Sequence, residues 1–177
     1  MAGLARTFQH PQLALDMTVR ENLTIAAASE HFDSTIGIVR SLFLGVPRSA
    51  RVTERVEEVA EEMHIEGLDR LVEDLALGEQ RLVEVARAFL RDPTLLLLDE
   101  PFAGGDPKGV ASMTDVLHRT VERGCGVLVV DHNVDIVASL VDRMVLMDMG
   151  KIVFDGAPAE AMASKEMRDV YFGTAGA

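Results

Sequence analysis

Four consecutive leucines, Leu95–Leu98, run directly into two carboxylates, Asp99 and Glu100, and the chain then continues through a proline into the glycine-rich stretch GGDPKG. A short apolar run with turn residues on both sides is typical of a strand that is buried on both faces of a parallel sheet. Ligands bind such sheets at the carboxyl ends of the strands. The sequence therefore predicts a ligand site beside these two acids.

A second apolar run, VLVVD, is followed directly by His132. The segment between the two runs, about residues 108 to 123, has the periodicity of a helix. Strand, helix and strand in this order predict an α/β domain with a parallel sheet, and they place His132 at the same sheet edge as Glu100. Four residues are expected to face inward from the intervening helix: Val110, Met113, Leu117 and Val121.

The composition narrows the class of protein. The 177 residues suffice for one domain with a core, and 17 basic against 29 acidic residues give a net charge of −12, which argues against nucleic acid as a partner. The single cysteine, Cys125, excludes an internal disulfide and fits a reducing compartment. No apolar run reaches the roughly 18 residues of a membrane span, so we expect a soluble, cytosolic protein that could still dock onto a membrane protein.

The chain is expected to contain two parts. Residues 10–78 are mostly helical in pattern and predict a helical lobe, whereas residues 1–9 and 79–177 predict an α/β half. Thr18 and Glu21 form a capping-box pattern, so a helix should begin near Val19. The stretch around Met149 and Gly150 alternates and predicts a hairpin. A later helix in the lobe should bury one apolar face and leave its glutamates in solvent, the buried residues being Val52, Val56, Val59, Ala60 and Met63.

The acids at the end of the leucine run suit nucleotide chemistry. A carboxylate at the position of Asp99 can hold Mg²⁺ through water, and the next carboxylate, Glu100, can polarise an attacking water. The alternative is a solvated strand end without a catalytic role. Upstream, LALGEQR places a glycine turn directly before a helix, whose N–H groups and positive end form an anion site.

The motifs ARTFQ, LALGEQR…ARAF, LLLLDEP, GGDP and VVDH, in this order, resemble the ATP-binding subunit of ABC transporters over nearly the whole chain. The resemblance implies a partial P-loop NTPase fold of the ABC ATPase type, with parallel strands plus a helical lobe, and ATP and Mg²⁺ as cofactors. It implies that Gln9 senses Mg²⁺ and the water, that Asp99 holds the metal, that Glu100 is the catalytic base and that His132 contacts the γ-phosphate. Asp106 would lie in a loop that communicates across a dimer.

The same resemblance implies that the stretch from Leu75 to Glu79 is the Leu-Ser-Gly-Gly-Gln signature, which closes on the nucleotide of a partner subunit. Three positions depart from that pattern, because Ala76 replaces the serine, Leu77 replaces the first glycine and Glu79 replaces the glutamine, while Gly78 is kept. The lost hydroxyl removes one phosphate hydrogen bond, worth roughly 0.5 to 3 kcal/mol. The chain is similar to the branched-chain amino acid importers in the stretches GLARTFQ, LALGEQR and VYFG. In those importers Leu-Ala-Tyr-Gly is a familiar signature. Related lipopolysaccharide, urea and amide transporters use similar subunits.

The phosphate-binding loop of this class, Gly-x-x-x-x-Gly-Lys-Ser/Thr, is not found in the sequence. GGDPKG does not replace it, because Lys108 is not followed by Ser or Thr and comes after the metal acid. We therefore expect an ATPase subunit recorded without its N-terminal Walker A part, which binds Mg·ATP weakly and is inactive on its own. The alternative is a degenerate half-ATPase, a non-catalytic interaction module that lends its signature to an intact partner.

The resemblance also implies the partners. They are a second ABC ATPase subunit, in a homo- or heterodimer, and transmembrane permease subunits that hold the chain on the inner face of the cell membrane. Part of the apolar cluster between Ile36 and Leu44, with the segment after Gln9, is expected to form the groove that receives a short permease helix. The transported substrate is chosen by other subunits.

Overall fold

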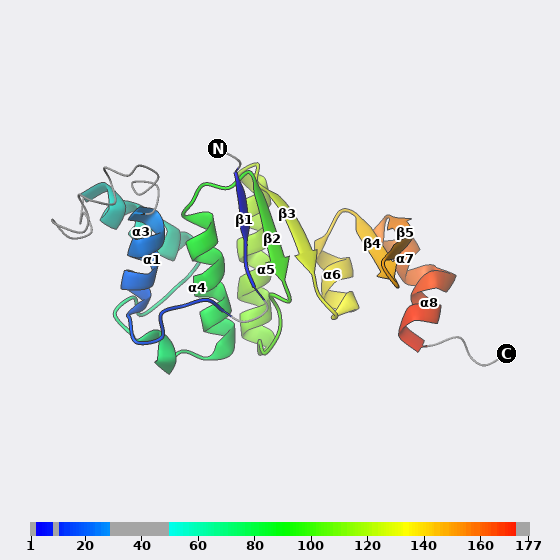
Figure 1. Ribbon diagram of the computed structural model, residues 1–177, viewed down its shortest axis with the longest axis horizontal. Helices are drawn as coiled ribbons and strands as arrows, with labels where there is room; N and C mark the ends of the chain where they lie inside the picture. The colour runs from blue at the N-terminus through cyan, green and yellow to red at the C-terminus, as the bar shows by residue number, and fades with distance from the viewer. Residues whose placement is uncertain (1–2, 9–10, 29–49, 173–177) are drawn as a thin grey trace. The chain divides into compact units, whose positions relative to one another are not determined.

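In the computed structural model the described residues are 3–8, 11–28 and 50–172, and they form two compact units, Met1–Asp131 and His132–Ala177 (Figure 1). Gln9 and the cluster between Ile36 and Leu44 lie outside the described residues, and so does the end of the N-terminal strand that the sequence predicted to reach Gln9.

The first unit is built on three parallel strands, which confirms the predicted α/β class. The strands are β1 (Leu4–Arg6), β2 (Leu95–Asp99) and β3 (Gly126–Val130), hydrogen-bonded in the order β1-β2-β3. The register pairs Arg6 with Leu97 and Asp99 with Val130. The carboxyl ends of all three strands therefore lie at one edge of the sheet.

The prediction that Leu95–Leu98 is buried on both faces is wrong, and so is the expectation that VLVVD is a second buried strand. In β2, Leu96 is fully buried but Leu95 is 39% exposed, and in β3 Leu128 and Val130 are 50% and 57% exposed. Within the described residues α4 packs against β1 and α5 packs against β3, and these two strands are the edges of the sheet. A run of leucines and valines indicates that a strand is apolar, but it does not indicate which face of the strand the helices cover.

The helices of this unit are amphipathic, as their patterns predicted. α1 (Val19–Ala28) begins at the expected residue, and the capping box is formed, because the Thr18 N–H donates to Glu21 Oε2 at 2.9 Å and the Glu21 N–H donates to Thr18 Oγ1 at 3.2 Å. α3 (Ala50–Glu62) lies against α1. All five of the apolar residues predicted for its inner side are buried: Val52, Val56, Val59, Ala60 and Met63.

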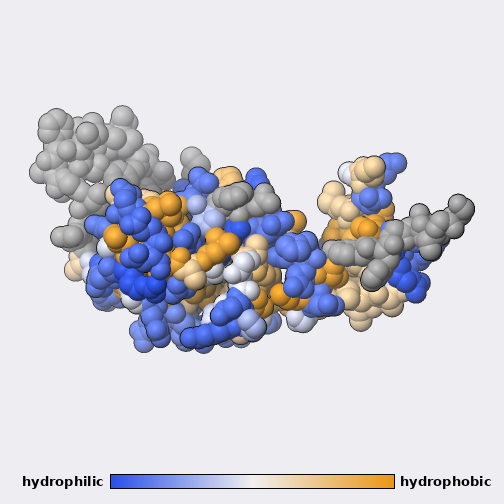
Figure 2. All heavy atoms as spheres, turned by 90° about the horizontal axis from the view of Figure 1, so that it is seen from below, coloured by the Kyte–Doolittle hydropathy of each residue, from blue (hydrophilic) through white to orange (hydrophobic). Residues whose placement is uncertain are grey.

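Two further helices pack against the sheet. α4 (Leu77–Phe89) follows the short 3-10 turn Val72–Asp74 and begins two residues before the predicted start near Glu79. α5 (Pro107–Glu122) joins β2 to β3 and buries Met113, Val116 and Leu117. Val121, predicted to face inward, is instead 48% exposed, and Thr120 beside it is buried. Figure 2 shows hydrophilic residues over much of the helical end of this unit, with hydrophobic patches between them.

The second unit contains the predicted hairpin. Its turn is made by Met149 and Gly150, both with positive φ (46° and 77°), which suits a tight hairpin turn. A small core of Met144, Ala161 and Met167 holds the hairpin against the neighbouring helices. The elements are α6 (Val134–Leu140), β4 (Met144–Asp148), β5 (Lys151–Gly156), α7 (Pro158–Ala163) and α8 (Lys165–Phe172). In the described part of the chain no helix is both long and apolar enough to cross a membrane.

Candidate functional site

The end of β2 turns sharply out of the sheet at the second acid. Asp99 is the last strand residue and Glu100 follows with φ 49°, the left-handed conformation that residues other than glycine rarely adopt. The Glu100 N–H donates to the carbonyl of Val130 at 2.7 Å, and the Glu100 carbonyl accepts from the Ala103 N–H at 3.2 Å. Such strained residues cost about 1 to 3 kcal/mol and gather at active sites, so this turn marks the candidate site.

Residues of β1 and its extension surround Asp99. The buried hydroxyl of Thr7 accepts a hydrogen bond from the Asp99 N–H at 3.3 Å. The Arg6 guanidinium lies 3.6 Å from Asp99 Oδ2 and 5.2 Å from the centre of the Phe8 ring. Sequence reasoning did not assign roles to Arg6 and Thr7. The signal that could have found them is the parallel pairing of ARTF with LLLLD, which brings their side chains to the strand-end acids.

The loop that follows Glu100 is hydrogen-bonded to the residue that follows β3. The carboxylate of Asp131 accepts a hydrogen bond from the Phe102 N–H at 3.3 Å, and Phe102 is buried. Asp131 therefore closes the loop on the sheet. The next residue, His132, belongs to the second unit, so its approach to Glu100 stays a prediction.

The donor set fits a nucleotide-bound Mg²⁺ better than a metal held by protein alone. Among the described residues no group of three or more His, Cys, Asp or Glu side chains could hold a metal ion. Mg²⁺ in nucleotide sites keeps several waters and takes one or two carboxylates plus substrate phosphates. Asp99, about one-third exposed at the strand end, can supply one such carboxylate.

The predicted signature turn forms the start of α4. Leu75 is buried, whereas Ala76 and Leu77 are exposed at the helix N-terminus. Glu79 Oε2 accepts a hydrogen bond from the N-cap N–H of Ala76 at 2.8 Å, and its Oε1 pairs with Arg70 at 2.9 Å. The glutamate that replaces the usual glutamine is thus engaged in capping its own helix, a local role that the motif comparison did not reveal.

The glycine loop after β2 packs against this turn. A Cβ on Gly104 would lie 2.5 Å from Leu77 Cδ2, and one on Gly78 would lie 3.5 Å from the Cα of Gly105. The next residue, Asp106, caps α5 by accepting a hydrogen bond from the Gly109 N–H at 2.7 Å. The structure thus brings the stretch Leu75–Glu79 and Asp106, distant in sequence, into one neighbourhood.

This contact yields a stability prediction for Gly104. Because its φ is +71°, Gly104→Ala should lower the free energy of unfolding by about 1 to 2 kcal/mol, the cost of a left-handed alanine. Gly105→Ala is the matched control, since its φ is not positive and its added methyl meets ordinary contacts at 3.4 Å, so the change should be about 0.5 kcal/mol or less. Urea denaturation of both variants measures the difference. Equal losses would contradict the backbone explanation.

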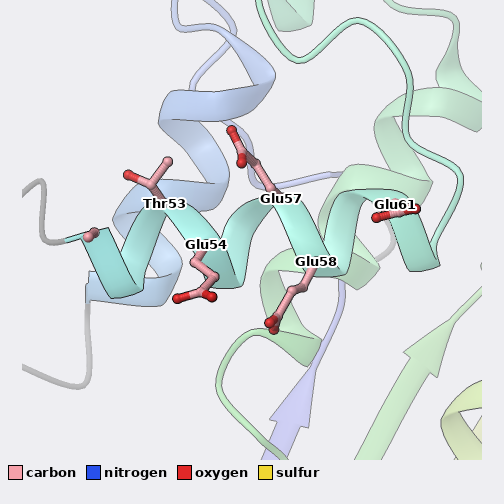
Figure 3. Close-up of a pocket in the computed structure, with 6 residues that line it drawn as sticks. Thr53, Glu54, Glu57, Glu58 and Glu61 are labelled. Carbon is pink, nitrogen blue, oxygen red and sulfur yellow. The ribbon is translucent and has the colours of Figure 1, made fainter.

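A pocket on the outer side of α3 lies apart from these residues. Figure 3 shows its glutamates projecting from one helix, and two of them have cationic partners, Glu57 with Arg20 at 3.2 Å and Glu58 with Arg55 at 3.5 Å. The pattern agrees with the predicted solvated acidic face. The lining residues are Ala50, Thr53, Glu54, Glu57, Glu58 and Glu61.

Comparison with solved structures defines the class of protein as an ATP-binding cassette. The chain is similar to the ATP-binding cassette MJ1267 of an ABC transporter in its ADP conformation, with a TM-score of 0.78 and 27% identity over 97% of this chain and 69% of that one. The family profile described as ABC transporter matches residues 2–103, more than half of the chain. The chain therefore belongs to the ABC transporter family.

Curated relatives agree with this family but differ in their transport systems. The chain is 38% identical over 121 residues to the lipopolysaccharide export system ATP-binding protein LptB of Escherichia coli K12, which covers 68% of this chain and 50% of LptB. It is 31% identical over 175 residues to the probable branched-chain amino acid transport ATP-binding protein LivG of Archaeoglobus fulgidus, covering 97% of this chain and 66% of LivG. The chain spans about half the length of the first of these relatives.

Proposed function

We propose that this chain is an ATP-binding and ATP-hydrolysing subunit of an ABC transporter, with ATP and Mg²⁺ as its cofactors. The observation that carries the proposal is the end of β2, where Asp99 closes the strand and Glu100 turns out of it in a left-handed conformation. Family membership supplies the reaction class, and this turn supplies two adjacent carboxylates at the strand end.

The two acids divide the chemistry between them. Mg²⁺, when bound with the nucleotide, neutralises charge on the phosphates. Asp99 would hold the metal through water, and the Thr7 hydroxyl and the Arg6 guanidinium fix the strand end and balance its charge. Glu100 accepts a proton from the attacking water. The family motifs give Gln9 the role of sensing the metal and the water, and they give His132 the role of contacting the γ-phosphate.

The turn at the start of α4 acts on a nucleotide held by a second ATPase subunit. Its exposed N-terminal N–H groups and the positive end of α4 suit a phosphate, and the contact with the glycine loop ties this turn to Asp106. Leu75, Ala76, Leu77, Gly78 and Glu79 together form this binding element. The subunits join as a homo- or heterodimer beneath permease subunits, on the cytoplasmic face of the membrane.

We favour branched-chain amino acid import as the transport process. The supporting observation is that the alignment with LivG extends over 97% of this chain, whereas the alignment with LptB extends over 68%. Lipopolysaccharide export is the competing assignment, and a transport assay with each substrate separates the two.

A second candidate is a chain that only lends its signature turn to an intact subunit. The printed sequence has no Gly-x-x-x-x-Gly-Lys-Ser/Thr motif, while the signature turn is formed and packed. Both candidates hold that the chain by itself hydrolyses no ATP.

The test is ATP hydrolysis by the transporter assembled with and without this chain. We expect Mg·ATP turnover that requires the chain, the second ATPase subunit and the permease together. Turnover that is the same when the chain is left out would contradict the proposed function.

A further inference from the structure

One face of α4 holds three charged side chains against the segment that follows β1. Arg81 and Glu84 are 5% and 8% exposed at their side chains, and Arg87, one turn further along, is partly buried. In Figure 1 the chain after β1 passes directly over α4. Charged side chains are rarely buried unless they are paired. The groups that pair with these three side chains therefore show which part of the chain they hold in place.

All three side chains bind backbone groups of the same short segment. Glu84 Oε1 accepts hydrogen bonds from the N–H of Phe8 and from the N–H of Gln12, each at 3.3 Å. Arg81 donates to the Phe8 carbonyl at 2.8 Å, and Arg87 donates to the Gln12 carbonyl. Both polar backbone groups of Phe8 and of Gln12 are therefore held by one helix.

Burial opposes the negative charge of Glu84, and its hydrogen bonds and arginine partners compensate for that burial. Burial raises the pKa of Glu84, although the two amide hydrogen bonds and the charges of Arg81 and Arg87 oppose that shift. Burial likewise lowers the pKa of Arg87. A carboxyl group whose pKa is raised on folding stabilises the fold below its unfolded pKa and loses that contribution as the pH rises through the folded value. An apolar residue in place of Glu84 alone would leave Arg81 and Arg87 without their anionic partner and the Phe8 and Gln12 amides without their acceptor, so the glutamate is matched to this segment.

Gln9 lies between Phe8 and Gln12 in the sequence, and α4 begins at the signature turn. We propose that Glu84 is a positioning residue that, with Arg81 and Arg87, fixes the backbone on both sides of the loop glutamine to the signature helix. As a consequence, the backbone at Phe8 and Gln12 moves together with the signature turn. The structural part of this inference is that Glu84 holds the backbone of Phe8 and Gln12, and it does not depend on the proposed function. The catalytic part is that this contact supports ATP turnover, and it rests on the proposed function.

Amide hydrogen exchange of the chain tests the structural part without nucleotide. Glu84→Leu should speed exchange at the Phe8 and Gln12 amides by about tenfold or more, the value of a hydrogen bond to a charged acceptor. Glu84→Gln keeps an acceptor oxygen in place and should restore most of the protection. Exchange at β2 amides in the same sample reports any general loss of stability.

Glu62→Leu is the matched control. Glu62 is also a mostly buried glutamate with an arginine partner, Arg123 at 2.6 Å, but it lies at the end of α3 and its partner lies at the end of α5. This variant should leave Phe8 and Gln12 exchange unchanged relative to β2. Equal acceleration in Glu84→Leu and Glu62→Leu, or no acceleration in Glu84→Leu, would overturn the proposal.

The assembled ATPase tests the catalytic part. Turnover per folded complex should fall by about tenfold or more in Glu84→Leu and by less than about threefold in Glu84→Gln and Glu62→Leu. If the turnover of the three variants follows their thermal stability and not their exchange rates at Phe8 and Gln12, the positioning role is overturned. If the wild-type assembly hydrolyses no ATP, the proposed function fails, while the exchange result still decides whether Glu84 holds the segment.

Discussion

Glu100→Gln, in a chain joined to a phosphate-binding loop of its class ahead of β1 and assembled with its partners, is expected to slow ATP hydrolysis by about 100-fold or more while ATP binding is kept, because a positioned general base is worth at least that much. Glutamine has nearly the shape of glutamate and meets the same left-handed backbone at φ 49°, so the turn should survive the change. Only the ability to accept a proton from water is lost. Turnover and ATP affinity, both measured in the assembled transporter, separate the chemical step from binding.

The control for this prediction is Glu122→Gln, which removes an exposed carboxylate at the end of α5 and should not alter turnover. If Glu100→Gln also leaves turnover at its own site unchanged, Glu100 has no part in the mechanism. The function of the chain would then be better described as lending its signature turn to an intact subunit.

Leu96→Ala is expected to cause the largest loss of stability. Leu96 is fully buried in the central strand β2, and truncating a buried leucine costs about 2 to 5 kcal/mol through lost burial and the cavity left behind. The adjacent Leu95 is 39% exposed, so Leu95→Ala should cost about 1 kcal/mol or less. Denaturant unfolding measures both values.

The contrast between these neighbours tests the alternating burial of β2. If both variants lost the same stability, the strand would be covered on both faces, as the leucine run alone had suggested. Because the free energy of unfolding of a domain is about 5 to 15 kcal/mol, the loss expected for Leu96→Ala is a large share of the total.

Local signals in the sequence were sufficient for much of the fold. The capping box of Thr18 and Glu21, the periodicity of α3 and the turn at Met149 depend on neighbouring residues, and each is present in the structure. The exposure of β3 and of Val121 was not predicted, because it depends on which side of an element other elements pack. Apolar composition does not carry that information.

The candidate site shows the same division between local and long-range signals. The adjacency of Asp99 and Glu100 at a strand end could be predicted, since it follows from a short motif. The contribution of Thr7 depends on the parallel register of β1 with β2, and that of Glu84 depends on a contact between residues 76 positions apart. Such contacts arise only when distant segments are brought together by folding.

The most direct measurement of the central claim is sedimentation velocity of the chain mixed with an ATP-binding subunit that carries its own phosphate-binding loop. If the turn at Gly78 closes on a nucleotide held by that subunit, Mg·ATP should produce a 1:1 complex that is lost when EDTA removes Mg²⁺. Gly78→Asp, which places a negative charge where the phosphate approaches, should abolish that complex. A mixture that shows no nucleotide-dependent association, or that associates equally in EDTA and with Gly78→Asp, would contradict the claim.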